Sequence, residues 1–214
     1  MKSILIIGMS TFGQHLLIEF SKRNCEVMIA DIDENILTPM VSYAVSAKIA
    51  DCTNEDVLRS FGVDEFDCCF VCLGGHFTEA LEVSYLLKEL GARKVISEVN
   101  RDIEKKFLLR NGADAVIYPE EDMAVRIAAT ESNDAVFDVI ELSDGYIIYE
   151  ISVPSAWVGK TIKELRVREK YNINIIAVKK NGHIIPVLAP DNKFSSDEHI
   201  IVMCHESDIK KFVK

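Results

Sequence analysis

The sequence predicts an α/β protein with a doubly wound parallel sheet, followed by a small α+β domain. Two observations predict the first part: short apolar runs alternate with amphipathic segments up to about residue 130, and a turn containing glycine joins the first run to a helix. A change of rhythm predicts the second part, because short strands and turn signals follow one another beyond this point. We therefore expect a first domain over residues 1–133 and a second over 134–214.

The predicted strands of the first domain are apolar along most of their length. Runs of this kind are typical of parallel strands that are covered by helices on both faces. The chain contains six of them before the change of rhythm: Ser3–Ile7, Val27–Ala30, Ala47–Ala50, Cys68–Leu73, Lys94–Glu98 and Ala115–Ile117.

Helical periodicity fills the segments between these strands. An N-cap pattern with an acidic first turn begins at Thr53, and glycines at 62, 91 and 112 follow the ends of three segments. Strands that alternate with helices imply parallel pairing with right-handed crossovers. The predicted helices lie within Phe12–Phe20, Thr53–Phe61, Ala80–Leu90, Ile103–Arg110 and Pro119–Thr130.

The second domain is predicted to consist mainly of strands. Asn181-Gly182 is the strongest hairpin signal in the chain. A domain of about 75 residues is near the size at which one core gives marginal stability, and a dimer that shares cores would relieve this. The predicted strands are Val136–Leu142, Gly145–Val153, Ile173–Lys179, His183–Leu188 and His199–Cys204, with helices at Thr161–Arg166 and after Ser207.

Composition narrows the classes of partner. The formal net charge is −10, which argues against nucleic acid and against adsorption to an anionic membrane surface. No apolar run approaches the roughly 18 residues that span a bilayer, and the run after Lys2 is too short for a signal peptide. We expect a cytoplasmic protein.

Six cysteines are scattered through core-like sequence. Cys69 and Cys72 have the spacing of a redox or zinc half-motif, but they lie in a predicted strand. Residues three apart in a strand point to opposite faces, so these thiols cannot converge on one metal. We interpret the cysteines as small buried apolar residues in a reducing compartment.

The turn after the first strand has the features of a phosphate-binding loop. Gly8 and Gly13 occupy the outer positions of the G-x-G-x-x-G pattern, and Ser10 replaces the middle glycine. The Ser10 hydroxyl could donate a hydrogen bond to a phosphate oxygen. Asp31 ends the second strand, where an acid accepts from both ribose hydroxyls and disfavours a 2′-phosphate. This Rossmann-like arrangement predicts an adenine nucleotide or dinucleotide other than NADP, unless the loop has kept its shape and lost its ligand.

Two further loops follow strands at the same edge of the predicted sheet. Asp51 would reach the adenine amino group or cap the next helix. Gly74-Gly75 would let a nucleotide lie close to the backbone or would serve a tight turn. His76 follows them and is the one histidine considered near a nucleotide, although a plain loop role at the entry to the next helix is the favoured interpretation.

Several strings, taken in their order, resemble the regulator-of-potassium-conductance (RCK, or KTN) family, the TrkA/KtrA-like cytosolic subunits of potassium uptake systems. The resemblance extends over nearly the whole chain, with one N-terminal and one C-terminal domain. It is carried by G-x-x-x-F-G at 8–13, the acid Asp31, Ala50-Asp51-Cys52-Thr53 with Glu55–Leu58, Pro119–Ala128, Val153-Pro154, Gly159–Leu165 and Tyr171–Ile175.

This resemblance implies a homodimer whose helix after Pro119 crosses to its neighbour. Dimers would form a ring, expected to be an octamer, beneath a membrane-embedded potassium pore subunit of the Trk/Ktr type, at the inner face of the cell membrane. A nucleotide such as NAD(H), ADP, AMP or ATP would change the shape of the ring and gate ion flow. The implied nucleotide contacts are Gly8, Ser10, Thr11, Phe12, Gly13, Asp31, Asp51, Cys52, Gly74, Gly75 and His76.

Two further sites are implied by the resemblance alone. Glu120 matches a glutamate that in some members helps to hold a cation near the phosphates at the dimer interface. In a subset of the family the C-terminal dimer binds cyclic di-AMP. The matching residues here are Ile162, Arg168, Asn174, Ile175 and Pro186.

The loop departs from the family pattern at two positions. Ser10 replaces the middle glycine, and Thr11 replaces an arginine that in relatives meets the terminal phosphate of ATP. These departures place ATP/ADP switching in question and favour NAD(H), AMP or ADP, or else a weaker site altogether.

A small NAD-dependent oxidoreductase is the alternative hypothesis. Such an enzyme needs a proton donor beside the nicotinamide, and the five histidines are dispersed without a paired carboxylate cluster. The second domain is also small for a substrate cavity. We therefore predict a nucleotide-sensing regulatory protein without catalytic residues.

Overall fold

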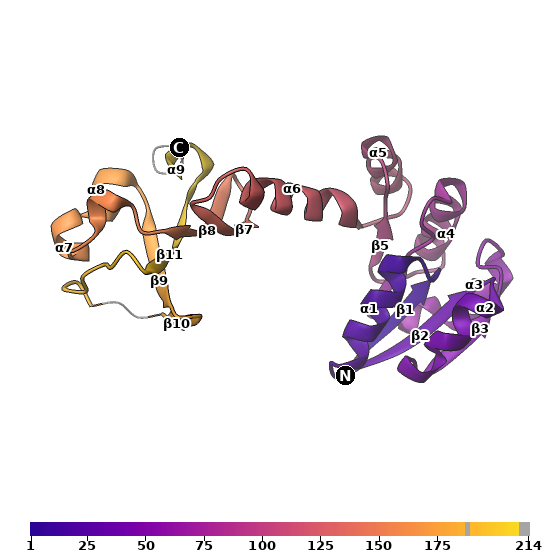
Figure 1. The fold of residues 1–214 in the computed structure, drawn as a ribbon. Helices are drawn as coiled ribbons and strands as arrows, with labels where there is room; N and C mark the ends of the chain where they lie inside the picture. The colour runs from indigo at the N-terminus through magenta and orange to yellow at the C-terminus, as the bar shows by residue number, and fades with distance from the viewer. Residues whose placement is uncertain (187–188, 210–214) are drawn as a thin grey trace. The chain divides into compact units, whose positions relative to one another are not determined.

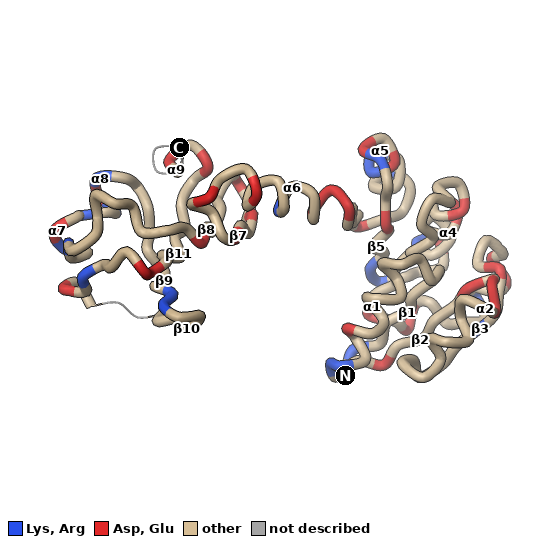
Figure 2. Tube along the Cα trace, viewed as in Figure 1, with Lys and Arg blue, Asp and Glu red and all other residues tan. Residues whose placement is uncertain are grey.

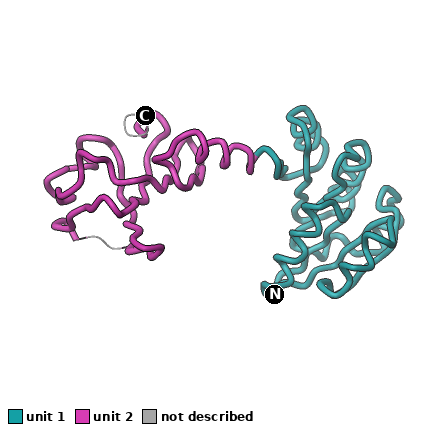
Figure 3. Tube along the Cα trace, in the orientation of Figure 1, with its two compact units in different colours: residues 1–121 teal, residues 122–214 magenta. Residues whose placement is uncertain are grey.

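The computed structural model describes residues 1–186 and 189–209, and the chain divides into two compact units (Figure 3). The first unit is Met1–Glu121 and the second is Asp122–Lys214. Each unit has its own sheet and its own buried apolar core. No helix in the described residues is both long and apolar enough to cross a membrane.

The first unit is built on a six-stranded parallel sheet in the order β3-β2-β1-β4-β5-β6 (Figure 1). The order reverses between β1 and β4, so the chain winds outward in both directions from the middle, as the strand–helix alternation predicts. The strands are β1 Lys2–Ile7, β2 Cys25–Asp31, β3 Ser46–Ile49, β4 Cys68–Val71, β5 Val95–Glu98 and β6 Ala115–Ile117.

Helices cover both faces of this sheet. Leu17 of α1 packs with Ile4 and Ile6 on one face, whereas Val83 of α4 packs with Leu5 on the other. Alternate residues of one strand therefore enter different cores, because side chains along a strand point to opposite faces. The helices are α1 Thr11–Ser21, α2 Glu34–Leu37, α3 Glu55–Phe61, α4 Phe77–Glu89 and α5 Asp102–Arg110, with 3-10 turns at Thr38–Tyr43 and Val63–Glu65.

Cys69 in β4 and Cys72, the residue after this strand, lie in different cores. Cys69 belongs to the core with Leu5, and Cys72 belongs to the core with Ile4. Both thiols are buried, and burial raises the pKa of Cys69 to about 12. The prediction that these two side chains point to opposite faces of the sheet is confirmed.

The second unit contains a five-stranded sheet in the order β10-β9-β11-β8-β7, with antiparallel pairing throughout. Asn181 and Gly182 have φ values of 50° and 79° and join β9 to β10, which confirms the predicted hairpin. The strands are β7 Val136–Glu141, β8 Tyr146–Ser152, β9 Asn174–Lys180, β10 His183–Ile185 and β11 Glu198–His205.

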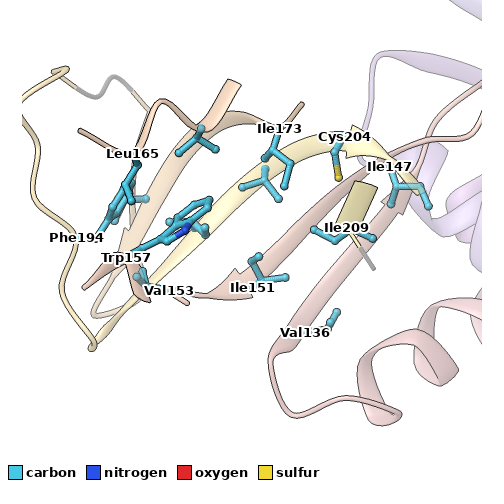
Figure 4. Close-up of a cluster of buried hydrophobic side chains, with 14 of the residues drawn as sticks. Val136, Ile147, Ile151, Val153, Trp157, Leu165, Ile173, Phe194, Cys204 and Ile209 are labelled. Carbon is cyan, nitrogen blue, oxygen red and sulfur yellow. The ribbon is translucent and has the colours of Figure 1, made fainter. Parts of the chain in front are cut away.

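One face of this sheet carries the core of the second unit (Figure 4). In this core the ring of Trp157 packs between two other aromatic rings. Its centroid lies 5.6 Å from that of Tyr171 and 6.1 Å from that of Phe194. Ile200 and Val202 of β11 are fully buried beneath it. The helices are α6 Pro119–Glu131, which begins in the first unit, α7 Ile162–Leu165, α8 Val167–Tyr171 and α9 Glu206–Ile209, with a 3-10 turn at Ser155–Trp157.

Helix α7 ends one residue before the end predicted for Thr161–Arg166. Arg166 adopts a left-handed φ of 49°, and a second short helix, α8, begins directly after it. The predicted strand His183–Leu188 ends at Ile185, and its positions 187–188 lie outside the described residues. The predicted terminal helix is present as α9 as far as Ile209, beyond which the chain is not described.

Candidate functional site

The first unit contains a cavity of about 860 Å³ at the carboxyl ends of β1, β2 and β4. This is the edge at which parallel doubly wound sheets bind ligands, and its volume lies in the range of small-molecule sites. Nine of the eleven residues predicted to contact a nucleotide line it: Gly8, Ser10, Thr11, Asp31, Asp51, Cys52, Gly74, Gly75 and His76. Phe12 and Gly13 are not in the lining.

The tight turn after β1 depends on two glycines. Gly8 has a φ of +86°, and a Cβ atom there would lie 2.4 Å from the carbonyl oxygen of Cys72. A Cβ atom on Gly13 would lie 2.8 Å from the Gly8 carbonyl oxygen. Any other residue would push the turn away from β4 or separate α1 from the sheet. Gly13 therefore serves packing, which explains why it is absent from the lining.

Most N–H groups of this turn already have partners. Gly8 N–H donates to the Ala30 carbonyl oxygen at 2.8 Å, and Ser10 N–H donates to that of Cys72 at 3.2 Å. Gly13 N–H donates to Ser10 Oγ at 3.1 Å, which caps α1. Thr11 and Phe12 occupy the first two helical positions, whose N–H groups have no intrahelical acceptor. These two backbone groups are the donors that an anion at the helix start would meet.

The Ser10 hydroxyl donates to Glu98 Oε2 at 2.7 Å, so it is not turned toward a phosphate as the sequence suggested. Glu98 ends β5 and is only 7% exposed. Burial raises the pKa of its carboxyl above the ordinary value, with a further rise from Glu120, against the lowering effect of hydrogen bonds from Ser10 and from Gly74 N–H. A buried carboxylate therefore lies behind the loop.

Asp31 contacts the turn directly. Its Oδ2 accepts from Met9 N–H at 2.6 Å, and its Oδ1 accepts from Asp33 N–H at 2.9 Å. Each carboxylate oxygen has a second lone pair, so both can still accept from a hydroxyl. Asp31 lies at the end of β2, in the place where an acid meets a ribose in such folds.

Asp51 lies in the loop after β3, the strand next to β2, and organises its own loop. Its Oδ1 accepts from the N–H of Thr53 at 3.0 Å and from the Thr53 hydroxyl at 2.7 Å, and these bonds lower its pKa. Asn54, not Asp51, caps α3. The neighbouring thiol of Cys52 is buried, and burial raises its pKa to about 12, so it is not a nucleophile at neutral pH.

The β4–α4 loop forms the third wall. Gly74 has a left-handed φ of +61°, whereas a Cβ atom on Gly75 would meet nothing within 4 Å. No steric contact within the chain therefore requires glycine at position 75, and this residue lines the cavity. His76 is exposed, with its Nδ1 3.7 Å from Glu79 Oε1.

The charged residues that line the cavity are all acidic. Four acids line it, Asp31, Asp33, Asp51 and Glu79, and no lysine or arginine is among the lining residues that the structure describes. Acidic segments are also seen near α2 and at the start of α6 (Figure 2). A ligand with few negative charges suits these walls better than a polyphosphate.

The predicted cation ligand, Glu120, is exposed on the first turn of α6. Within the described part of this single chain, no group of three or more His, Cys, Asp or Glu side chains is arranged to hold a metal ion. The prediction concerned an interface between two chains, so it stays a prediction.

The residues predicted for a second ligand lie on several elements of the second unit. Ile162 and Ile175 are partly buried against its core, while Arg168 and Pro186 are exposed. A second cavity of about 430 Å³ lies beside Trp157 and Tyr171, and none of the five predicted residues, including Asn174, lines it. This site also stays a prediction.

Sequence reasoning missed several contributors to the first site, Glu79 of the walls among them. Glu98 supports the loop from β5, Met9 supplies the N–H that binds Asp31, and Asp33 adds a fourth acid to the walls. The available signal for Glu98 was its position at the carboxyl end of a predicted strand, next to the switch point. Met9 acts through its backbone, and its identity carries no signal of that kind.

Family models match most of the chain. Residues 4–119 match the TrkA-N domain and residues 146–214 match the TrkA-C domain. The chain is 33% identical to Ktr system potassium uptake protein C of Bacillus subtilis (strain 168) over 213 residues, covering 100% of this chain and 96% of that protein. It is 34% identical to Ktr system potassium uptake protein A of the same organism over 211 residues, covering 99% and 95%.

Solved structures show the same fold. The GsuK RCK domain superposes with a TM-score of 0.68 at 17% identity, covering 99% of this chain and 47% of that chain. The GsuK channel bound to NAD superposes with a TM-score of 0.69 at 17% identity, covering 97% of this chain and 38% of that chain. This chain therefore spans less than half of either structure.

Proposed function

The chain belongs to the family of proteins built from TrkA-N and TrkA-C domains, and on this premise we propose that it is a nucleotide-sensing regulatory subunit of a Trk/Ktr-type potassium uptake system. The full-length match to two Ktr potassium uptake proteins is the observation that carries the proposal. The pore itself is a separate membrane protein, and this subunit acts on it from the cytoplasmic side.

The ligand of the first unit is proposed to be an adenine nucleotide. The cavity at the switch point supports this, because Asp31 stands where a ribose is recognised and α1 offers two N–H groups at its start. The structural neighbour solved with NAD has the same fold. The nucleotide contacts named from the sequence remain the proposed binding residues.

We assign residues 1–133 to the nucleotide-binding domain and 134–214 to a regulatory domain. Helix α6 supports a homodimer, since Met123, Val125 and Ile127 are 51%, 44% and 52% exposed on it. Assembly of dimers into a ring, with an octamer as the expected size, would convert a change in one domain into a change felt by the pore. Cyclic di-AMP is a proposed ligand of the regulatory domain.

The coupling has a thermodynamic requirement. A nucleotide can change ion flow only if it binds the two states of the ring with different affinity. Potassium flux through a reconstituted Trk/Ktr-type pore should therefore differ between NAD(H), ADP and ATP. Asp31→Ala should abolish that difference at a fixed nucleotide concentration, and identical flux under all conditions would contradict the gating proposal.

We propose that the chain has no catalytic activity of its own. The one histidine in the cavity lining is exposed and lies beside Glu79, and burial raises the pKa of both cysteines there, Cys52 and Cys72. Turnover of NADH with a panel of carbonyl and quinone acceptors tests the oxidoreductase alternative. Measurable turnover that is lost in His76→Ala would establish that alternative.

A further inference from the structure

The buried carboxylate behind the phosphate-binding loop has no counterpart in the predictions from sequence. Two loops of the cavity act on Glu98: the Ser10 hydroxyl donates to it at 2.7 Å from the loop before α1, and the N–H of Gly74, in the loop before α4, lowers its pKa. Both Ser10 and Gly74 line the cavity. The carboxylate of Glu98 therefore lies directly behind Ser10 and Gly74, which line the cavity that an anion would enter.

The hydrogen bonds favour a charged Glu98. Burial, the largest effect, raises the pKa of Glu98, whereas the Ser10 hydroxyl and the Gly74 N–H stabilise its ionised form. The recorded charged neighbour is another acid, Glu120, and no lysine or arginine acts on it within the described residues. The negative charge is thus uncompensated by a cation.

This charge lies close to the part of the cavity that would receive phosphates. Ser10 is the N-cap of α1, so the residue that donates to Glu98 directly precedes the free N–H groups of Thr11 and Phe12. An anion on those N–H groups gains from the helix dipole and is repelled by Glu98. The repulsion grows with every added phosphate, whereas the gain from the two N–H groups does not.

We propose that Glu98 is a specificity-determining residue, which makes this nucleotide site prefer adenine ligands of low phosphate charge, such as AMP or NAD⁺, over ADP and ATP. The inference rests on the proposed function and deepens it by naming the ligand class. Glu98 does not contact the adenosine; it sets how much negative charge the loop tolerates. The four acids of the walls add to the same preference from a greater, more solvated distance.

The test is a binding series with adenosine, AMP, NAD⁺, ADP and ATP, measured by calorimetry on the full chain at pH 8 without divalent cations. Wild-type affinity should fall from AMP to ATP. In Glu98→Gln, which keeps the size of the side chain and one acceptor, ATP should bind about tenfold more tightly, while adenosine changes less than about twofold. Glu82→Gln is the matched control, because it removes the same charge from an exposed position of α4 outside the cavity.

Each outcome decides the matter. If the ratio of ATP to adenosine affinity is the same in wild type and Glu98→Gln, Glu98 does not determine the specificity. The proposed nucleotide site is not contradicted by that result. If no member of the series binds the wild-type chain, the nucleotide site itself is wrong and this inference falls with it. Glu98→Met removes the charge at similar volume and replaces the amide variant if that variant does not fold.

Discussion

At the scale of single residues, Asp31 joins two parts of the site. Its carboxylate accepts from the N–H of Met9 in the candidate phosphate loop and lies at the end of β2, the proposed ribose position. Asp31→Ala should weaken binding of an adenosine ligand by about 1–3 kcal/mol, because a hydrogen bond to a charged group is lost. Calorimetry measures this directly. Asp64→Ala, outside the cavity lining, is the control, and equal affinity in Asp31→Ala and wild type would show that the site is misplaced.

The two adjacent glycines of the β4–α4 loop should respond differently to the same change. Gly74→Ala places a Cβ at a φ of +61° and should cost about 1–2 kcal/mol of unfolding free energy. Gly75→Ala meets empty space and should alter stability by less than about 0.5 kcal/mol, yet weaken nucleotide binding if the ligand lies against this residue. Chemical denaturation and calorimetry on both variants separate the two effects. Unchanged ligand affinity in Gly75→Ala would remove this loop from the site.

Ser10 shows where residue-level prediction from sequence ends. The pattern of Gly8 and Gly13 predicts the loop, its turn and its close packing, and the Cβ contacts at both positions give the physical reason. The bond of the Ser10 hydroxyl to Glu98, 88 residues away along the chain, was not predicted. A side-chain rotamer that depends on a distant strand leaves no local signal.

At the scale of elements, the short helix α7 depends on a capping box. Glu164 N–H donates to Thr161 Oγ1 at 3.1 Å, and Thr161 N–H donates to Glu164 Oε2 at 2.7 Å. Thr161→Ala should cost about 1 kcal/mol of unfolding free energy. Trp157 is the single tryptophan of the chain and is buried in the second unit, so its fluorescence reports this loss. Glu164→Gln keeps the capping-box pattern and should cost less; an equal loss would contradict the capping role.

The sheet of the second unit carries a polar cluster with a defined pH dependence. Glu150 on β8 accepts from Lys179 Nζ at 2.9 Å and lies 2.7 Å from His199 Nδ1. Burial alone would raise the pKa of Glu150, but these two partners outweigh it, and the pKa is lower than usual. A lowered carboxyl pKa stabilises the fold above the unfolded-state pKa, and this contribution disappears as the pH falls through the folded-state value.

Unfolding of the wild type and Glu150→Gln should therefore differ by about 1–2 kcal/mol at pH 7. The difference should shrink as the pH falls below the ordinary glutamate value of about 4.3. Denaturation curves followed by Trp157 fluorescence at several pH values measure this. A difference that is constant from pH 7 to pH 3 would mean that packing, rather than charge, is responsible.

Sequence patterns predict helices and strands best where the hydrophobic periodicity agrees with the capping and turn residues. All six strands of the first unit were predicted, because apolar runs and helix caps alternate without interruption. Helix α2 and the 3-10 turn Thr38–Tyr43 were missed, since neither is long enough for an apolar stripe. The short helix α8 was missed for a different reason: Arg166 takes a left-handed conformation that neither its identity nor its neighbours indicate.

At the scale of the whole molecule, α6 leaves apolar side chains in water. None of its residues is buried, and Ile127 is 52% exposed. A second copy of the chain is the proposed cover, so Ile127→Glu should shift the oligomer toward monomers by placing a charge in an apolar interface. Native mass spectrometry reports the species present. Ile184→Glu is the matched control, because Ile184 is 57% exposed on β10, and equal dissociation in both variants would point to a general loss of solubility.

The sequence correctly predicted a parallel sheet followed by a smaller part built mainly of antiparallel strands. The strand–helix rhythm and the later hairpin signals separate a parallel sheet from an antiparallel one, and both sheets are present. The sequence pattern does not predict which distant strands pair with one another. The cluster of Glu150, Lys179 and His199 comes from three strands that are neighbours only once the antiparallel sheet has formed.

The geometry of the candidate phosphate-binding loop, residues 8–10, also has a kinetic consequence. The N–H groups of Gly8, Met9 and Ser10 are tied to Ala30, Asp31 and Cys72, so both flanking strands hold the loop before any ligand arrives. Little conformational entropy is then lost when a ligand binds. Association should be a single fast phase, and differences in affinity between nucleotides should lie in their residence times.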